Sequence, residues 1–180
     1  MPSVQSMMAR KSSITNAFVN AIIPVIPPTA EDVDEALLIL EISPWDLRCA
    51  YCGDTATEWD HLRPLVRSRR PTGYVSEIAN LVPSCGKCNQ SKGNRDWEAW
   101  MRSNAPLSPT GRQLPDVEQR IARLKRFEGW RPVSPIDFEK LLGPGAWQEY
   151  WQHCDRVIDC LRESQAVADA LRRRIAEQHR

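Results

Sequence analysis

The sequence predicts a mostly helical α+β protein, with a small strand-containing core held by a four-cysteine zinc site and flanked by N- and C-terminal helices. Three observations predict this class. Four of the six cysteines form two Cys-x-x-Cys pairs, 49/52 and 85/88, with 32 residues between Cys52 and Cys85. Two short strand candidates lie in that interval, at 57–62 and 80–83. Helical patterns precede residue 44 and follow residue 103.

The first 44 residues are expected to form a helical arm. An apolar stretch at 13–23 predicts a short helix, which the prolines at 24, 27 and 28 end. Thr29 is a typical N-cap, and Asp32 three residues later predicts a capping box. The second helix is therefore expected over 31–42, with Pro44 stopping it.

Residues 45–103 carry the chemistry. Strands are expected at 57–62 and 80–83, separated by a loop that includes residues 67–77 with Pro71 and Gly73. A helix is expected to begin near Cys88 and to continue irregularly past Gly93 to Met101. Trp97 and Trp100 lie three residues apart on one face of this helix, and we interpret them as core residues rather than base-stacking groups.

Residues 104–180 form a C-terminal helical region. Pro106, Pro109, Gly111 and Pro115 predict a linker, followed by helices over 115–127, 135–142 and 144–178. The last helix carries a heptad-like series: Tyr150, Cys154, Val157, Leu161, Ser164, Ala168, Leu171 and Ile175. Such a stripe either pairs with a second copy, giving a homodimer, or packs on its own domain.

Composition and charge restrict the classes of protein to which this chain can belong. No apolar run reaches the roughly 18 residues of a membrane span, and no secretion signal is evident, so an intracellular, cytoplasmic protein of bacterial or phage origin is expected. Metal binding is then favoured over disulfides. The net charge is +1, but residues 60–95 are rich in Lys and Arg. Such a stretch either attracts a phosphate backbone or is a solvated loop.

The two cysteine pairs predict a zinc site. Zn²⁺ takes four thiolates in a tetrahedron, and Cys49, Cys52, Cys85 and Cys88 supply them. All four positions are then filled by protein, so no position is left for water or substrate. The zinc is therefore structural, and its removal is expected to unfold the small core.

A further motif lies between and beside the cysteine pairs. It reads Trp59-Asp60-His61-Leu62-Arg63-Pro64, then Asn80-Leu81-Val82-Pro83, then Cys85-Gly86-Lys87-Cys88-Asn89-Gln90-Ser91-Lys92-Gly93. Over roughly residues 49–100 this pattern resembles the HNH endonuclease family, also called the ββα-metal nucleases. That family includes restriction and homing enzymes, colicin DNases and one nuclease domain of the RNA-guided DNA cutters. The resemblance implies a ββα-metal core.

The resemblance also implies a role for each matched residue. His61 corresponds to the general base, and Asp60 to the metal ligand before it. Asn80 corresponds to the middle asparagine, which braces the loop and orients the histidine. Asn89 takes the third motif position, a metal ligand that is His or Asn among relatives, so the metal preference stays open. Lys92 is expected to contact the scissile phosphate.

The chemistry explains these residue types. A neutral histidine accepts the proton of the attacking water at neutral pH. A hard cation, Mg²⁺ or Mn²⁺, stabilises charge on the phosphate and the leaving oxygen, and needs few protein oxygens because it keeps most of its water. Asp60 and Asn89 would supply those oxygens. Because neighbours on a strand point to opposite faces, the strand is expected to bend or end at His61.

DNA is the expected partner, cut to leave a 5′-phosphate and a 3′-hydroxyl. The expected backbone contacts are Arg63, Arg67, Arg69, Arg70, Lys87 and Arg95. Restriction and phage defence are the biological roles favoured. Two alternatives stay open: a non-catalytic zinc-binding module for nucleic acid or protein, and an RNase with the same site.

Overall fold

The structure is a computed structural model that describes residues 4–179; residues 1–3, at the start of the predicted N-terminal arm, and residue 180 lie outside the described part. The chain divides into two compact units, of which one is Ile23–Ile136 and the other combines the residues on either side of it. Helices predominate and the sheets are small. The mostly helical α+β class is therefore confirmed.

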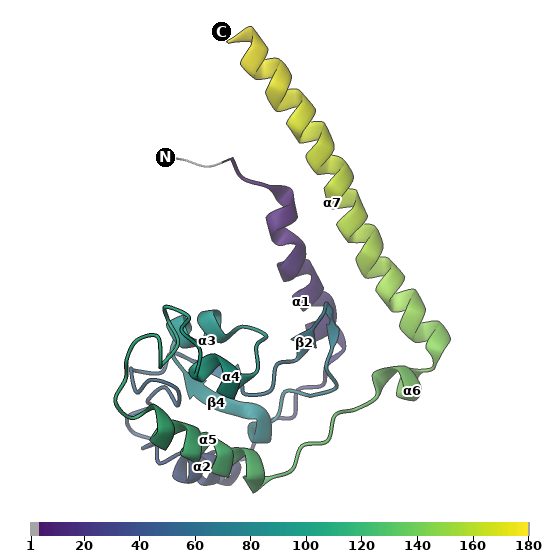
Figure 1. Cartoon of the computed structure of the whole chain (residues 1–180). Coiled ribbons are helices and arrows are strands. Elements are labelled where there is room, and N and C mark those ends of the chain that lie inside the picture. Colours follow the sequence, from purple (N-terminus) through teal and green to yellow (C-terminus); the bar gives the residue numbers. More distant parts are fainter. Residues whose placement is uncertain (1–3, 180) are drawn as a thin grey trace. The chain divides into compact units, whose positions relative to one another are not determined.

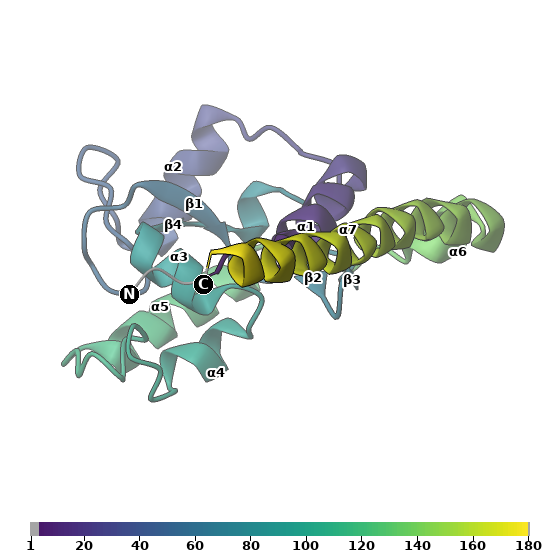
Figure 2. The ribbon, with the colours of Figure 1, turned by 90° about the horizontal axis from the view of Figure 1, so that it is seen from above.

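The larger unit, Ile23–Ile136, contains the two predicted strands. β1 (Glu58–His61) pairs antiparallel with β4 (Leu81–Ser84), and the register places Asp60 opposite Val82 and His61 opposite Leu81. Figure 2 shows the two strands side by side with helix α3 next to them. The strand ends at His61, as expected.

Helix α3 (Gly86–Lys92) follows β4 directly. The sequence predicted a helix that begins near Cys88 and continues irregularly to Met101, whereas the structure has two separate helices over this span. The chain leaves the helix at Gly93, whose φ of 51° is in the left-handed region. A separate helix, α4 (Trp97–Met101), then begins where the Asp96 carboxylate accepts a hydrogen bond from the Ala99 backbone N–H at 2.9 Å.

Two longer helices complete the core of this unit. α2 (Ala30–Ile39) begins with the predicted capping box of Thr29 and Asp32, and α5 (Val117–Trp130) contacts it (Figure 1). Residues from both helices pack with Trp97, Trp100 and the four clustered cysteines into one apolar core. Trp97 and Trp100 are 3% and 1% exposed, which confirms their interpretation as core residues.

One compact unit of the structure takes in parts of all three predicted segments. The sequence placed 1–44, 45–103 and 104–180 in three segments, with a linker after residue 103. In the structure α2, α5 and the loop between α4 and α5 all belong to the unit that contains β1 and β4. The loop is not a free linker, because Ser108 is 0% exposed and its hydroxyl donates to the carbonyl oxygens of Ser103 and Ala105.

A short hairpin that the sequence did not predict lies between β1 and η2 (Ile78–Asn80). Its strands are β2 (Val66–Arg67) and β3 (Arg70–Pro71), joined by Ser68 and Arg69. Both joining residues have positive φ, 50° and 65°. Two consecutive positive φ values are typical of the tight turns that match strand twist, but Ser-Arg carries none of the usual glycine or asparagine signal.

The other unit contains η1 (Met7–Arg10), α1 (Lys11–Ile22), α6 (Phe138–Leu142) and α7 (Pro144–Gln178). The predicted bounds of the last helix are confirmed. α1 and η1 contact α7, and the Tyr150 hydroxyl donates to the Phe18 carbonyl oxygen at 2.8 Å.

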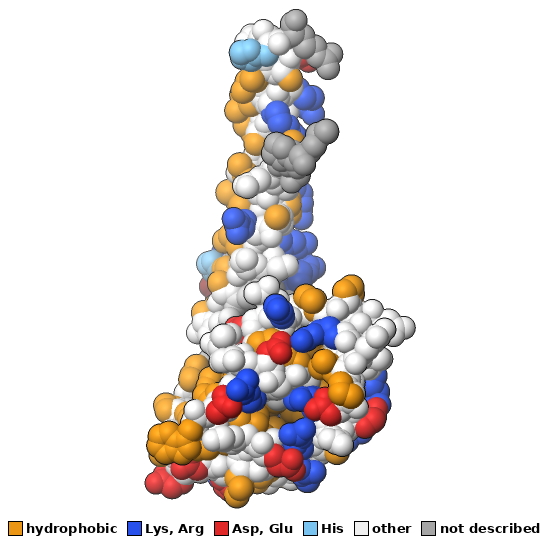
Figure 3. All heavy atoms as spheres, turned by 90° about the vertical axis from the view of Figure 1, so that its left-hand side faces the viewer, with side chains coloured by type: hydrophobic (Ala, Val, Ile, Leu, Met, Phe, Trp, Pro, Cys, Tyr) orange, Lys and Arg blue, Asp and Glu red, His pale blue; other side chains and the backbone are white. Residues whose placement is uncertain are grey.

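Of the heptad-like series on α7, Cys154 is buried, whereas Val157, Leu171 and Ile175 are exposed. Hydrophobic side chains form a row along one edge of this helix in Figure 3. Among the described residues, no helix has the length and apolar character needed to span a membrane.

Candidate active site and metal centre

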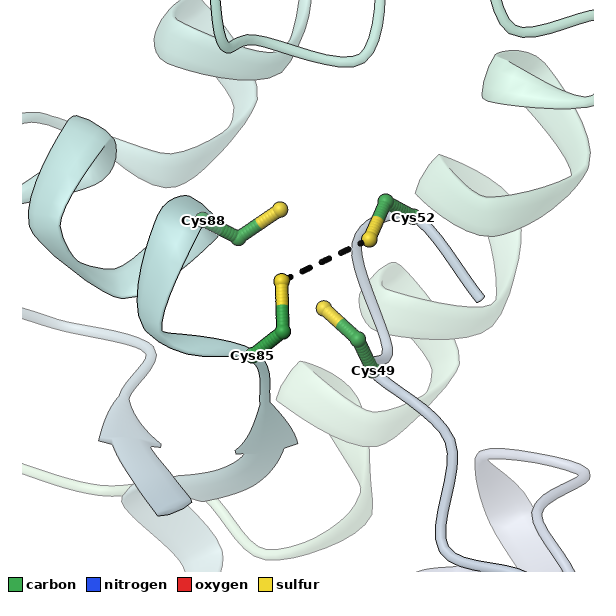
Figure 4. Close-up of side chains that lie close together, drawn as sticks. All are labelled: Cys49, Cys52, Cys85 and Cys88. Atoms are coloured by element: carbon green, nitrogen blue, oxygen red, sulfur yellow. Dashed lines mark hydrogen bonds between the residues drawn. The ribbon is translucent and has the colours of Figure 1, made fainter. Parts of the chain in front are cut away.

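The four cysteines of the two Cys-x-x-Cys pairs come together. Their Sγ atoms all lie within 4.8 Å of one another, all four residues are buried, and none is in a disulfide. Figure 4 shows the sulfurs pointing toward a common centre. The Cys52 and Cys85 sulfurs are 3.7 Å apart. Tetrahedral Zn–S bonds of about 2.3 Å require sulfur separations of about 3.8 Å, so this donor set has the composition and spacing to bind zinc.

The local chain geometry explains why the cysteines converge. Cys85 is the N-cap of α3 and Cys88 lies in its first turn, so both thiols leave the same helix end. The first pair lies in a turn closed by hydrogen bonds from Gly53 N–H to the Cys49 carbonyl and from Cys49 N–H to the Asp54 carbonyl, at 2.8 and 2.7 Å. The Ala50 N–H donates to the Pro83 carbonyl at 2.8 Å, which fixes this turn beside β4.

Gly53 is required in that turn for two reasons. Its φ is 81°, and a Cβ there would lie 2.7 Å from Nη2 of Arg120. We expect Gly53→Ala to lower the free energy of unfolding by roughly 1–3 kcal/mol, measured by urea denaturation. Gly129→Ala is the matched control, because nothing lies within 4 Å of that position in α5. There alanine should raise stability by about 0.5–1 kcal/mol. Equal effects at both positions would contradict this reading.

Asp60 lies in a buried polar cluster. Its Oδ2 accepts a hydrogen bond from the Tyr51 hydroxyl at 2.7 Å and is 3.2 Å from Nζ of Lys92. Burial raises the pKa of Asp60, and Lys92 and Tyr51 partly offset that rise. Lys92 also donates to the backbone carbonyls of His61 and Gly93, at 3.0 and 3.1 Å. The lysine therefore ties α3 to the end of β1.

This position disagrees with the role expected for Lys92. The side chain is 1% exposed and bonded on all sides by protein. A phosphate cannot reach it in this conformation. The reason is that α3 directs Lys92 inward, onto the face of β1 that presents Asp60. The positive charge of Lys92 and the negative charge of Asp60 then offset each other's cost of burial.

Removing Lys92 would leave the Asp60 carboxylate buried without its cation. We expect Lys92→Met to lower the free energy of unfolding by about 3–5 kcal/mol, measured by urea denaturation. The double variant with Asp60→Asn should recover part of that loss. Lys125→Met is the control, because its ion pair with Glu98 is exposed and contributes less than about 1 kcal/mol. A Lys92→Met protein as stable as wild type would refute the structural role.

His61 follows Asp60 in β1, so strand alternation puts it on the opposite face, and it is partly buried. Its Nε2 is 3.0 Å from the Ser76 hydroxyl. Ser76 is in turn held by the segment after α1, through backbone hydrogen bonds to Pro24 and Ile26. Among residues 4–179, Nδ1 of His61 has no hydrogen-bond partner. The ring is thus fixed through one nitrogen, and the other can accept a proton.

Burial, and secondarily the positive charge of Lys92, lower the pKa of His61 from 6.5 to about 4. The unfolded chain therefore binds more protons between about pH 4 and 6.5, so stability rises with pH across that window. We expect the urea midpoint of wild type to fall as the pH drops from 6.5 toward 4. His61→Gln should weaken that dependence. Identical pH profiles for the two proteins would contradict the shift.

Asn80 is 0% exposed and connects the segments around the histidine. Its Oδ1 accepts from the Arg63 N–H at 2.8 Å, and its Nδ2 donates to the carbonyls of Arg63 and Val75, at 3.0 and 3.3 Å. The Leu62 N–H donates to the Asn80 carbonyl at 2.8 Å. One side chain therefore fixes both the loop that leaves His61 and the segment that leads to Ser76.

Asn89 lies on α3, directly after Cys88. Its Nδ2 donates to Oε2 of Glu58 at 3.0 Å, and Glu58 shares the β1 face of Asp60. In residues 4–179, Oδ1 of Asn89 and Oδ1 of Asp60 make no hydrogen bond. Each expected cation ligand thus retains one oxygen of the kind that Mg²⁺ prefers. The structure records no contact between the Asp60 and His61 side chains.

The predicted nucleic-acid residues divide into two groups. Arg67, Arg69, Lys87 and Arg95 are exposed, and Arg70 is partly exposed. Arg63 differs: its side chain is 13% exposed and bonds to Glu128, 3.2 Å from Oε1. It also lies over the Tyr74 ring. Arg63 borders a cavity of about 570 Å³ that none of the expected catalytic residues lines. The structure therefore places Arg63 as a packing residue.

Sequence reasoning missed several side chains that contact the site. They are Tyr51 against Asp60, Glu58 against Asn89, and Ser76 against His61. Glu58 had a signal, because it lies two residues before Asp60 and so on the same face of the strand. Tyr51 and Ser76 had none, since their contacts depend on how distant loops pack.

Residues 49–95 match the model of the HNH endonuclease family. It is also similar to the CRISPR-associated endonuclease Cas9 of Corynebacterium diphtheriae, with 29% identity over 137 residues. That match covers 72% of this chain but 12% of Cas9, so the chain spans about an eighth of that relative's length. No solved structure matches the chain. Both matches are with endonucleases.

Proposed function

We propose that this protein is a metal-dependent DNA endonuclease in which His61 is the general base. The proposal depends on two properties of this histidine: the protonation of its imidazole at neutral pH and the absence of a protein partner at one ring nitrogen. Its imidazole is neutral at pH 7, because its pKa is lowered to about 4, and its Nδ1 is without a protein partner among the described residues. A neutral imidazole with one free nitrogen accepts a proton from water.

Asp60 and Asn89 would hold the catalytic cation. Both retain a free side-chain oxygen, and both lie on the β1–α3 face, where Glu58 adds a second carboxylate. When bound, Mg²⁺ or Mn²⁺ supplies stabilisation of charge on the phosphate and the leaving oxygen. Asn80 keeps the loop after His61 in place, and Ser76 fixes the imidazole plane. Arg67, Arg69, Arg70, Lys87 and Arg95 are the residues proposed to bind the phosphate backbone.

The antiparallel pair β1–β4 followed by α3 supports a ββα-metal core, and the four cysteines support a structural zinc beside it. The zinc would have no open position and would take no part in the reaction. Its role would be to fix Asn89, which follows Cys88, against β1.

Labelled oligonucleotides test the substrate and the products. We expect Mg²⁺-dependent cutting of DNA that leaves a 5′-phosphate and a 3′-hydroxyl. An RNA oligonucleotide of the same sequence tests the RNase alternative, because the site contacts phosphate rather than sugar. Cleavage of RNA in preference to DNA would reassign the substrate. No cleavage of either by folded, zinc-loaded protein would favour a binding module.

Restriction or phage defence is the proposed biological role, and homodimerisation through α7 is proposed with it. Two active sites in one dimer would cut both strands. The exposed side chains of Val157, Leu171 and Ile175 support pairing, as they lie on one helix stripe. Sedimentation velocity on the free protein and on its DNA complex tests this. A strict monomer in both samples would contradict the proposed homodimer.

A further inference from the structure

Two arginines of the larger unit lie against the first cysteine pair and have no part in the proposed reaction. Nη2 of Arg112 is 3.1 Å from Oδ2 of Asp54, two residues after Cys52. Nη2 of Arg120 would meet a Cβ on Gly53, the residue directly after Cys52, at 2.7 Å. One arginine comes from the α4–α5 loop and the other from α5. Both guanidinium groups therefore reach the same turn of the chain.

Each guanidinium has a buried nitrogen without a hydrogen-bond partner. These atoms are Nη1 of Arg112 and Nε of Arg120. Buried donors are nearly always satisfied, because an unmade hydrogen bond costs free energy. The Cys52 side chain lies near the Arg112 guanidinium. A neutral thiol accepts a hydrogen bond weakly, whereas a metal-bound thiolate carries negative charge and accepts strongly.

The positions of both arginines are set by their surroundings. Ser108, which is 0% exposed, accepts a hydrogen bond at its hydroxyl from the Gly111 N–H at 3.0 Å, and its carbonyl accepts from the Arg112 N–H at 2.9 Å. A Cβ on Gly111 would lie 2.0 Å from the Ala105 carbonyl oxygen, so this tight loop needs glycine. Arg120 is held from its own helix by Asp116, at 2.6 Å. Both cations are thus positioned before any metal binds.

We propose that Arg112 and Arg120 compensate the charge of a four-thiolate zinc centre and slow the loss of its metal, with Arg112 acting on the Cys52 sulfur. Four thiolates around Zn²⁺ leave a net negative charge inside an apolar core. Two fixed guanidinium groups at its edge would offset part of that negative charge. The α4–α5 loop and α5 are therefore functional parts of the metal site. This inference rests on the zinc centre of the proposed function.

The test uses the full-length protein and measures zinc directly. Zinc per chain is determined by mass spectrometry, and its release to an excess of the chromogenic chelator 4-(2-pyridylazo)resorcinol is followed with time. We expect Arg112→Met and Arg120→Met to release zinc about tenfold faster or more than wild type, the usual effect of losing a group that supports a metal ligand. Arg112→Lys should release zinc at a rate between those of wild type and Arg112→Met, because lysine keeps the positive charge but lacks the several N–H donors of the guanidinium group.

Arg102→Met is the matched control. Arg102 also bridges two carboxylates, Glu98 and Glu118, but it is exposed. Its zinc release should stay within about twofold of wild type, since an exposed ion pair contributes little. Release from the Arg112 and Arg120 variants at the wild-type rate would overturn the inference while leaving the zinc centre intact. A wild-type protein that holds no zinc would overturn the zinc centre itself, and the inference with it.

Cobalt substitution provides a second measurement in case Arg112→Met does not fold. The sulfur-to-cobalt charge-transfer band should move to lower energy in Arg112→Lys, and further in Arg112→Met if it folds, because the Cys52 thiolate loses a donor. The band in Arg102→Met should not move. An unshifted band in the Arg112→Lys protein would overturn the role assigned to Arg112.

Discussion

His61→Ala is expected to abolish most cleavage of DNA, with the single-turnover rate in Mg²⁺ falling by about 10²–10⁴-fold. The reason is that no other base replaces the imidazole. Asp60 on the adjacent position is bonded to Tyr51 and Lys92 and points to the other face of β1. Rates are measured on a labelled duplex with protein in excess, so that product release does not limit them.

The control for that variant is His153→Ala, which removes an exposed histidine of α7. Its rate should equal that of wild type. Zinc content and thermal stability of both proteins are measured alongside, because His61 is partly buried. A His61→Ala protein that retains its fold and zinc and cuts within tenfold of wild type would rule out His61 as the base.

Loss of zinc is expected to unfold the larger unit. Structural zinc contributes an apparent free energy of about 10–16 kcal/mol in small zinc domains, which is comparable to the roughly 5–15 kcal/mol by which a whole domain is stable. The four cysteines also line the core that contains Trp97 and Trp100. We expect Cys88→Ser to bind no zinc and to show the tryptophan fluorescence of solvent-exposed indole rings.

Cys160→Ser is the matched control, since Cys160 is exposed on α7 and lies outside the cluster. It should retain zinc and native fluorescence. Native fluorescence and a cooperative melting transition in zinc-free Cys88→Ser would contradict the structural role of the metal.

Local patterns explain the parts of the fold that the sequence predicted well. The cysteine pairs, the capping box at Thr29 and the strand ending at His61 each depend on a few neighbouring residues. The same holds for α7, which begins at a proline and keeps its helical pattern to Gln178. In such segments the signal and its structural consequence lie in the same stretch of chain.

Tertiary packing explains the errors. The prolines and Gly111 of the α4–α5 loop indicated a linker, but Ser108 and Gly111 build a tight loop, and Arg112 at its end pairs with Asp54. The helix predicted to continue irregularly past Gly93 is interrupted there, because Asp96 caps a second helix. Lys92 could not be placed from sequence, because its burial depends on a partner, Asp60, 32 positions earlier on a different element.

In the candidate site, too, some residues could be predicted from local sequence and others depend on tertiary packing. Asp60, His61, Asn80 and Asn89 came from a motif, whereas their supports Tyr51, Glu58 and Ser76 came only from the structure. Motif residues are recognisable because chemistry fixes their type and order. Their supports can be any residue of suitable size and polarity that packing brings within reach.

Incubation of supercoiled plasmid with wild type and His61→Ala, in EDTA, Mg²⁺ and Mn²⁺, tests the central claim most directly, with zinc content measured in each sample. Nicked or linear DNA is predicted only for wild type with added metal. Cleavage that persists in EDTA or in His61→Ala, or none by zinc-loaded wild type in either metal, would contradict a metal-dependent nuclease with His61 as its base.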